Sequence, residues 1–455
     1  MFRRILIANR GEIALRIIRA CADLRVEAVA AFSEADRGAP WFSRAERTVC
    51  IGPARAEESY LNADAVLQAA EQTECQAIHP GYGFLAENAL FAARCEQQGI
   101  TFIGPGAAAI GRMGDKAEAK RTMAAAGLPT IPGSHDLLAD VRDALRGAAA
   151  IGYPVLLKAT AGGGGRGMRR CEGERDLERA FPEAALEAEK AFGDPRLYLE
   201  KFIAGGRHVE FQVLADAFGR VACLGERECS VQRHHQKLLE ESPSPAVDAE
   251  TRRAMGDRVA GAVATFGYRS AGTLEFLRTP GGDFYFMEMN TRLQVEHPVT
   301  EMVTGVDLVV EQIRIAALHR LSLQPEAAEP RGHAIEFRIN AEDPDAGFRP
   351  DPGTITAFVP PAACLPGVRV RWDSAIQPGY RIPPHYDSMV GKLIVHGPDR
   401  ETALRGAREA LASIRIEGVR TTLPLHQRIL DHPDFRRGEY DVGFLARAGL
   451  ARAVQ

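Results

Sequence analysis

Apolar residues in the first hundred positions recur in two alternating patterns, short continuous runs and stretches with a spacing of three to four residues. The short runs predict buried strands, and the spaced stretches predict helices. Strands are expected at 4–8, 28–32, 76–79 and 100–103, and helices at 12–24, 63–72 and 87–98. Strands that alternate with helices pair in parallel beneath helices on both faces. We therefore expect a doubly wound N-terminal α/β domain over residues 1–113.

Beyond residue 113 the strand-like runs mostly follow one another directly, which predicts antiparallel pairs. Strands are expected at 154–160, 168–171, 196–203, 209–215, 221–228, 272–277, 284–290, 333–340, 355–358, 368–372 and 389–396, with a helix at 401–414. A central region is expected over 114–330 and a small mixed C-terminal domain over 331–455. The whole chain therefore predicts an α/β and α+β multidomain architecture.

Composition narrows the classes of function. A chain of 455 residues, 45% hydrophobic and 25% charged, is typical of an enzyme with two to four domains. The net charge of −4 and the lack of a basic run argue against nucleic-acid binding. No apolar run has the length of a membrane span or a signal peptide core, so we expect a cytoplasmic protein. The eight cysteines include no CxxC pair, which predicts reduced, buried thiols.

The densest group of functional side chains lies in Asp283–Thr300. Side chains alternate along a strand, so Glu288 and Asn290 share one face. A hairpin through 280–283 would bring Glu275 opposite Glu288. Carboxylate and amide oxygens suit Mg²⁺. A surface hairpin with solvated charges is the alternative, but acids within apolar strands are costly to bury without a cation.

An anion site is expected beside this metal site. Arg292, Gln294 and Glu296 follow directly and provide a cation, an amide and a base. Arg338 lies on the polar face of the strand at 333–340, and that face can look into the same cleft. Tyr82 lies in a glycine-rich loop after a strand end, where a structural turn and a binding loop are equally good interpretations.

The glycines at Gly162–Gly167 satisfy the GxGxxG pattern, but a strand follows them and not a helix. They are therefore expected at the tip of a hairpin, where exposed backbone N–H groups suit a flap over phosphates. A flexible linker is the alternative, although Lys158 in the preceding strand favours the flap. The adjacent His234 and His235 point apart on a loop, which favours a polar segment near ATP over a transition-metal site.

Eight motifs, in order along the whole chain, resemble those of biotin carboxylase, an ATP-grasp enzyme. They are IANRGEIA at 7–14, HPGYGFL at 79–85, MGDK at 113–116, GGGGRGM at 162–168, HVE at 208–210, QK at 236–237, EMNTRLQVEHPVTE at 288–301 and YDSM at 386–389. The resemblance implies that biotin is carboxylated on its ureido nitrogen with ATP, Mg²⁺ or Mn²⁺, and bicarbonate, through carboxyphosphate. It also implies a flap subdomain over about 131–203 within an ATP-grasp region.

The resemblance assigns roles to individual residues. Glu296 matches the general base, Arg338 the residue that faces the biotin enolate, and Tyr82 a wall of the biotin pocket. The bicarbonate cradle matches Lys237, Arg292, Gln294 and the backbone of Val295, and the metal ligands match Glu275, Glu288 and Asn290. Contacts with ATP are implied for Lys116, Lys158, Gly162, Gly163, Gly164, Gly165, Met168, Glu200, Lys201, Ile203, His208, Gln232, His235, Glu275 and Glu288. An edge strand at 196–203 would present backbone groups to the purine.

None of the nine methionines precedes a lysine, the usual context of a biotin attachment site, so biotin is expected on a separate biotin carboxyl carrier protein. The resemblance also implies a homodimer and carboxyltransferase subunits, as in acetyl-CoA carboxylase, without specifying the acyl acceptor. Another ATP-grasp ligase and a non-catalytic nucleotide-binding subunit are the alternatives. The RLQVEH motif at 292–297 argues against the first, and the presence of both the metal acids and the base argues against the second. Departures from the family pattern at 40–47, His234, Asp351 and His385 bear on subunit contacts and the downstream partner.

Overall fold

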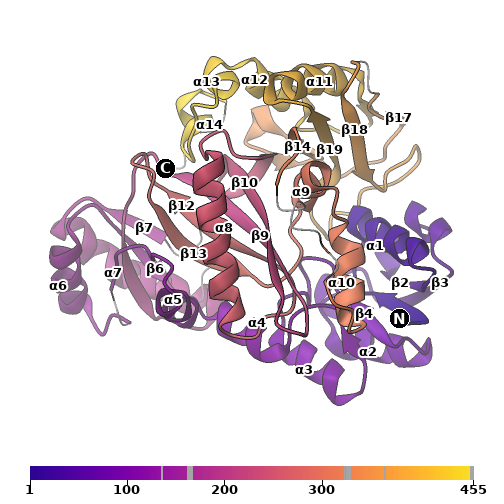
Figure 1. The fold of residues 1–455 in the computed structure, drawn as a ribbon, viewed down its shortest axis with the longest axis horizontal. Coiled ribbons are helices and arrows are strands. Elements are labelled where there is room, and N and C mark those ends of the chain that lie inside the picture. Colours follow the sequence, from indigo (N-terminus) through magenta and orange to yellow (C-terminus); the bar gives the residue numbers. More distant parts are fainter. Residues whose placement is uncertain (135–136, 161–167, 322, 324–328, 363–364, 451–455) are drawn as a thin grey trace.

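The computed structural model describes residues 1–134, 137–160, 168–321, 323, 329–362 and 365–450 (Figure 1). Within them the α/β and α+β architecture is confirmed. Two large sheets and one small sheet form its framework. No helix in these ranges is long and apolar enough to cross a membrane.

The N-terminal region is a parallel five-stranded sheet, as expected, with strand order β3-β2-β1-β4-β5. Its elements are β1 (Arg4–Ile7), α1 (Gly11–Asp23), β2 (Glu27–Ser33), β3 (Arg47–Gly52), α2 (Ala63–Gln72), β4 (Ala77–His79), α3 (Ala89–Gln97), β5 (Thr101–Phe102) and α4 (Ala107–Gly114). The sequence pattern does not predict β3, because this edge strand is largely exposed and contains a single buried residue.

An antiparallel sheet of eight strands, in the order β13-β12-β9-β10-β11-β14-β19-β18, forms the centre of the molecule. The strands are β9 (Arg207–Ala215), β10 (Val221–Arg233), β11 (Gln236–Ser242), β12 (Ser270–Arg278), β13 (Phe284–Asn290), β14 (His333–Asn340), β18 (Arg369–Ser374) and β19 (Met389–Gly397). β11 pairs with β14, so the sheet runs without a break across residue 331. The central and C-terminal regions therefore share one sheet.

The two faces of this sheet differ in chemistry. One face is apolar and packs beneath α8 (Ala249–Ala264) and α11 (Arg400–Ser413), with Phe276 and Phe337 among its buried residues. The other face carries buried charged residues and packs against α9 (His297–Thr304). In Figure 1, α8 crosses the sheet near the middle of the molecule. The polar face is the one that carries the candidate site.

A small three-stranded sheet, β7-β6-β8, forms a separate lobe with two helices and lies at the far left of Figure 1. Its elements are α6 (Val141–Ile151), β6 (Val155–Ala159), β7 (Met168–Cys171), α7 (Glu174–Phe192) and β8 (Leu197–Lys201). β6 and β7 pair antiparallel, which confirms the predicted hairpin. The glycines that join them lie outside the described residues. β8 is an edge strand of this sheet, as expected.

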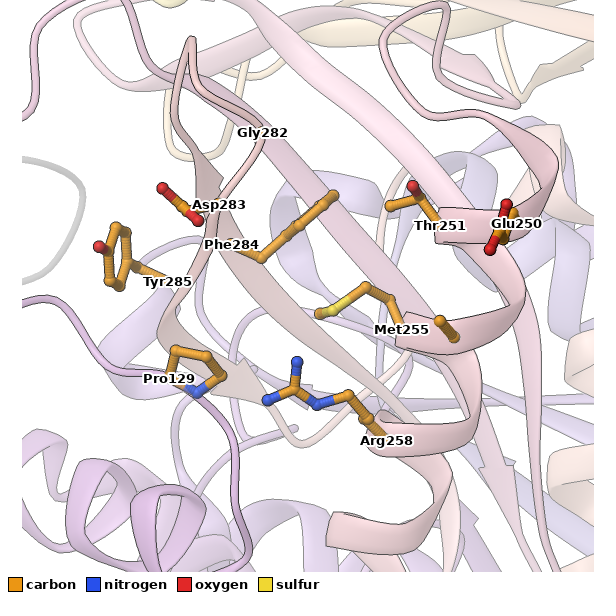
Figure 2. Close-up of a pocket in the computed structure, with 10 residues that line it drawn as sticks. Pro129, Glu250, Thr251, Met255, Arg258, Gly282, Asp283, Phe284 and Tyr285 are labelled. Atoms are coloured by element: carbon orange, nitrogen blue, oxygen red, sulfur yellow. The ribbon is translucent and has the colours of Figure 1, made fainter.

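The remaining elements complete the chain. They are α5 (Lys116–Ala125), α10 (Leu308–Ala316), β15 (Glu342–Asp343), β16 (Arg349–Pro350), β17 (Ala357–Val359), β20 (Arg415–Glu417), α12 (Leu423–Asp431), α13 (Pro433–Arg437) and α14 (Phe444–Arg447). A surface hollow between α8 and the β13 hairpin is lined by Pro129, Met255, Arg258, Phe284 and Tyr285 among others (Figure 2). None of its lining residues belongs to the predicted site.

Candidate active site

The hairpin of β12 and β13 places Glu275 directly opposite Glu288, as expected from the predicted hairpin. The register shifts by one residue after this pair and leaves Met287 as a β-bulge. The bulge lets Phe286 pack into the core beneath α8, while Asn290 donates from Nδ2 to Oε1 of Glu275 over 2.8 Å. Two carboxylates and an amide therefore lie together on the polar face.

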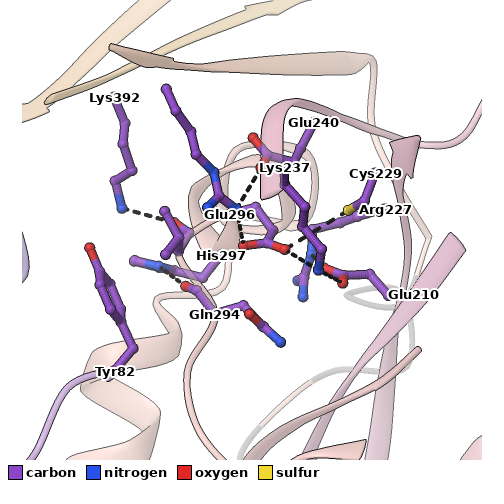
Figure 3. A network of polar contacts seen from close by, with 12 residues as sticks. Tyr82, Glu210, Arg227, Cys229, Lys237, Glu240, Gln294, Glu296, His297 and Lys392 are labelled. Carbon is purple, nitrogen blue, oxygen red and sulfur yellow. Dashed lines mark hydrogen bonds and ion pairs between the residues drawn. The ribbon is translucent and has the colours of Figure 1, made fainter. Parts of the chain in front are cut away.

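Lys237 is at the centre of the buried charges (Figure 3). A second bulge, at Leu238 in β11, turns the Lys237 side chain to the polar face of the sheet. Its Nζ lies 2.5 Å from Glu210, 2.9 Å from Glu275 and 2.7 Å from Glu296. Burial alone would lower the pKa of Lys237, but the three carboxylates raise it well above its ordinary value. Lys237 is therefore a fixed positive charge.

Glu296 precedes α9 and is completely buried. Its Oε2 accepts from Nη2 of Arg338 over 2.8 Å, and its Oε1 accepts from Lys237. Burial alone would raise the pKa of Glu296, but Lys237 and Arg338, with Arg227 behind them, hold it well below its ordinary value. Glu296 is therefore ionised and, while these cations face it, only weakly basic.

Arg338 lies on the polar face of β14, as the alternation predicts, and its Nη2 also lies 2.6 Å from Glu240. Glu240 is the cross-strand neighbour of Glu336, and both carboxyl groups are fully buried. Burial raises the pKa of Glu240 to about 7 against the opposing effect of Arg338. Arg338 is thus held between two acids, one on the sheet and one on the loop before α9.

Arg292 and Gln294 extend the same loop toward the N-terminal sheet. Nε of Arg292 donates to Glu87 over 2.8 Å, and its Nη2 donates to Oδ1 of Asn290 over 3.2 Å. Its Nη1 donates to Oε1 of Gln294 over 3.2 Å. The loop therefore lies between the predicted metal acids and the segment before α3.

The predicted phosphate contacts form a second group, centred on Glu200 of β8. Lys158 of β6 and Lys120 of α5 both form ion pairs with this buried carboxylate. Lys116, at the start of α5, lies 3.7 Å from Glu288. Three lysines from two segments are thus close to two acids, which leaves a positive balance suited to a polyphosphate.

The other predicted nucleotide contacts are more dispersed. His208 joins the metal acids, with Nε2 3.0 Å from Glu275, and Gln232 is hydrogen bonded to its Nδ1 over 2.6 Å. The Lys201 side chain instead donates to the backbone of the turn before β6. His235 lies exposed in the tight β10–β11 turn. Met168 begins β7, Ile203 follows β8, and Gly162 to Gly165 lie outside the described residues.

Two groups of side chains in the described ranges have the spacing of metal ligands. His208, Glu210 and Glu275 form one group, and Glu210, Cys229 and Glu296 form the other. The ammonium group of Lys237 contacts both, so a cation already lies within each group. The adjacent His234 and His235 belong to neither group.

Tyr82 lies in the loop after β4 and faces the same region (Figure 3). Its hydroxyl donates to Oε1 of Glu12, at the start of α1. The Tyr82 ring centroid lies 5.9 Å from Nζ of Lys392, which is on β19. Three distant segments therefore meet at this tyrosine.

Several charged residues of the site are absent from the sequence prediction. They are Glu12, Glu87, Lys120, Glu210, Arg227, Glu240 and Lys392. One of them carries a signal that could have revealed it: Lys392 is a cation within an apolar strand pattern, and it is fully buried. A cation in a buried strand requires acidic or carbonyl partners. The others resemble ordinary surface charges until the fold is known.

Comparisons with known proteins agree with this geometry. Residues 1–110 match the biotin carboxylase N-terminal domain, residues 336–447 match the biotin carboxylase C-terminal domain, and residues 115–324 match the ATP-binding domain of the carbamoyl-phosphate synthase L chain. Biotin carboxylase from Nostoc is 53% identical over 98% of both chains.

Solved structures agree as well. The biotin carboxylase domain dimer of Hydrogenobacter thermophilus 2-oxoglutarate carboxylase, in complex with MgADP, ADP and bicarbonate, has a TM-score of 0.94 at 49% identity over all of both chains. A Campylobacter jejuni biotin carboxylase complex has a TM-score of 0.95 at 48% identity, covering 98% of this chain and 99% of that one. The middle family model alone would allow a carbamoyl-phosphate-type enzyme, but the two flanking models do not. The chain belongs to the biotin carboxylase family.

Proposed function

We propose that this chain carboxylates biotin with ATP and bicarbonate, through carboxyphosphate, using the residues of the buried charge cluster. The observation that carries the proposal is the position of Lys237 and Arg338, whose cationic groups both contact Glu296. An anion that reaches these two cations also reaches a carboxylate base. Bicarbonate is an anion that must lose a proton as it attacks, so the arrangement suits it.

In the first step, bicarbonate takes the place of Glu296 as a partner of Lys237 and Arg338. Loss of these contacts raises the pKa of the buried Glu296 carboxylate and makes it a stronger base. Glu296 then accepts the bicarbonate proton while a bicarbonate oxygen attacks the γ-phosphorus of ATP. Arg292, Gln294 and the Val295 backbone complete the cradle, and the products are ADP and carboxyphosphate.

Glu275 and Glu288 suit Mg²⁺ or Mn²⁺, because their positions are paired across the strands and Asn290 lies on the same face. When bound, the ion neutralises charge on the phosphate oxygens of ATP. Glu275 also contacts Lys237, so one carboxylate orients both the nucleotide side and the bicarbonate side.

The nucleotide is proposed to lie between the small lobe and the large sheet. Lys116 and Lys158 contact its phosphates, and we add Lys120 because it shares Glu200 with Lys158. Lys201 and Ile203 contact the purine through their backbone. This agrees with the Lys201 side chain, which donates to the backbone of the turn before β6 and not toward the nucleotide. The glycines at 162–165, with Met168, His208, Gln232 and His235, remain part of the proposed ATP site.

In the second step, carboxyphosphate separates into CO₂ and phosphate. The phosphate accepts the ureido N–H proton of biotin, and the nitrogen attacks CO₂. Arg338 stabilises the negative oxygen that develops on the ureido group, and Tyr82 forms a wall of the biotin pocket. Water would destroy carboxyphosphate, so a closed, dry site is required.

The proposal extends to partners and organisation. We propose a homodimer that acts on a biotin carboxyl carrier protein and supplies carboxyltransferase subunits, with acetyl-CoA as the first candidate acceptor. The match to a domain of a 2-oxoglutarate carboxylase makes a different acceptor the second candidate. We retain the division at 1–113, 114–330 with a flap at about 131–203, and 331–455. Free thiols at every described cysteine suit the cytoplasm as the location.

Bicarbonate-dependent ADP release, measured with and without free biotin, tests the function. We expect slow ADP release that requires bicarbonate and rises with biotin, and we expect a biotinylated carrier to raise the rate further because its remote contacts help position the ureido ring. ADP release that ignores both bicarbonate and biotin would favour another ATP-grasp ligase. ATP binding without any ADP release would favour a non-catalytic subunit.

A further inference from the structure

Lys392, like Arg227, is a fully buried cation that the sequence analysis does not assign to the site. It lies in the middle of β19, has no exposed surface, and is flanked along the strand by apolar residues. β19 is hydrogen bonded on both sides, to β14 and to β18, so the backbone at this position is held firmly. A fully buried ammonium group requires partners, because its desolvation is costly.

The partners of Lys392 come from two other parts of the chain. Its Nζ, seen in Figure 3, donates to the carbonyl oxygen of Val295 over 2.9 Å. It also lies 3.0 Å from Oε1 of Glu12. The same Glu12 oxygen accepts the hydroxyl of Tyr82. A continuous polar connection therefore runs from Tyr82 through Glu12 and Lys392 to the backbone of Val295.

Other charged groups surround this connection. Asp373 of β18 adds negative charge near Lys392, the nearby Glu336 of β14 has its own pKa raised well above its ordinary value by burial, and Arg371 opposes the acids. Burial alone would lower the pKa of Lys392, but these acids and Glu12 raise it above its ordinary value. Lys392 therefore stays charged. Its contacts are directional, since one partner is a single backbone carbonyl.

The Val295 carbonyl is well placed to transmit this contact. Val295 is directly followed by Glu296, which contacts Lys237 and Arg338. A fixed carbonyl also fixes the orientation of the peptide group between Val295 and Glu296, because the peptide is planar. Small displacements of reacting groups reduce rates strongly. The position of Lys392 can thus affect the geometry of the base and of the cradle.

We propose that Lys392 is a positioning residue that orients the Val295–Glu296 loop and couples it, through Glu12, to Tyr82. The proposal rests on the proposed function, because it assigns the loop to bicarbonate and Tyr82 to biotin. Under it, bicarbonate and biotin are held by one rigid connection that spans the N-terminal sheet, the large sheet and the loop before α9.

The test is a steady-state comparison of Lys392→Met with the wild-type chain. Methionine keeps much of the length and removes the donor. We expect the KM for bicarbonate to rise about 10- to 100-fold, the range for losing a residue that orients a functional group, while the KM for ATP stays within about twofold. A purely structural residue would lower the active fraction and leave both KM values unchanged.

Two further variants protect the test against misfolding. Lys392→Met leaves Glu12 without its cation, so the double variant Lys392→Met, Glu12→Gln removes both charges and should show the same rise in the KM for bicarbonate. The single variant Glu12→Gln keeps the hydrogen bond from Lys392 to the Val295 carbonyl oxygen. We expect it to raise the KM for biotin more than the KM for bicarbonate. It carries the test if neither Lys392 variant folds.

Arg252→Met is the matched control, because Arg252 neutralises the buried Glu226 on the apolar face of the same sheet. The Arg252→Met variant should have lower stability but unchanged KM values for bicarbonate and biotin. A folded double variant with a wild-type KM for bicarbonate would overturn the positioning role, and unchanged KM values in Glu12→Gln would overturn the coupling. Failure of the wild-type chain to cleave ATP with bicarbonate would count against the proposed function instead.

Discussion

The bicarbonate side and the nucleotide side of the site solve the same electrostatic problem differently. On the bicarbonate side, Lys237 contacts three carboxylates, and Glu296 has no exposed surface. On the nucleotide side, the Glu288 side chain is 41% exposed, and Lys116 approaches it only to 3.7 Å. The first side neutralises its own charges before any ligand arrives. The second pairs Lys120 and Lys158 with Glu200 but keeps three lysines against two acids, a positive balance that suits a polyphosphate.

The difference follows from burial. An unpaired charge in the interior is destabilising by several kcal/mol, so the buried cluster must pair its charges within the fold. A charge near the surface is solvated, so it needs no partner within the fold before a polyphosphate and its metal ion bind. A bicarbonate ion must therefore exchange partners with Glu296, whereas a nucleotide adds new partners. This contrast implies that substitutions on the two sides have different consequences.

Glu296→Gln should have the largest effect, because it removes the proposed base from the self-neutralised side. The amide keeps the shape but cannot accept the proton, so both bicarbonate-dependent ATP cleavage and biotin carboxylation should fall by roughly 10²–10⁴. Measuring ADP and carboxybiotin in parallel checks the expectation. Near-normal ATP cleavage in this variant would place the base elsewhere.

Arg338→Ala should separate the two half-reactions. We expect biotin carboxylation to fall by on the order of 10²–10³, the usual effect of removing one donor to a developing oxyanion. Bicarbonate-dependent ATP cleavage should fall much less, because Lys237, Arg292 and Gln294 still hold bicarbonate. It should not remain untouched, because Arg338 contacts Glu296 and, in the proposed first step, bicarbonate. Equal losses in the two assays would remove Arg338 from the second half-reaction.

Glu288→Gln tests the open side. The apparent affinity for Mg²⁺ should fall about 10- to 100-fold, as for other changes that weaken a metal site, and excess Mg²⁺ should restore much of the activity. Excess Mg²⁺ should restore less activity to Glu275→Gln than to Glu288→Gln, because Glu275 also contacts Lys237 and Asn290. Titrating ADP release with Mg²⁺ in both variants sharpens the comparison. Equal rescue would mean that the two acids act only through the metal.

Acid stability should report the buried side with the smallest effect. The pKa of Glu296 is lower in the folded chain than in the unfolded chain, so its contribution is present above the unfolded pKa of about 4.5 and is lost as pH falls below it. Below that pH the free energy of unfolding of the wild-type chain should fall more steeply than that of Glu296→Gln, by up to about 1.4 kcal/mol per pH unit. Denaturant unfolding at pH 5, 4 and 3 measures this, and an unchanged slope would contradict the self-neutralised cluster.

Much of the fold follows from local periodicity. The parallel N-terminal sheet, the β6–β7 hairpin and the pairing of Glu275 with Glu288 are all expected from apolar runs and turn residues, and all are present. Periodicity does not reveal the bulges at Met287 and Leu238, because the extra residue is itself apolar and its position, beyond which all side chains change face, is set by pairing with another strand. Both bulges turn site residues to the polar face.

The sequence by itself determined the order of elements, the family and the set of motif residues, because these depend on neighbours in the chain and on spacing. Only the tertiary structure decided which charge neutralises which. Lys237 meets Glu296, and Lys392 meets Glu12, because a loop and a helix far away in the chain pack against the strands that carry the two lysines. A buried charge must be paired where a closed fold excludes water, and that exclusion is a property of the whole molecule.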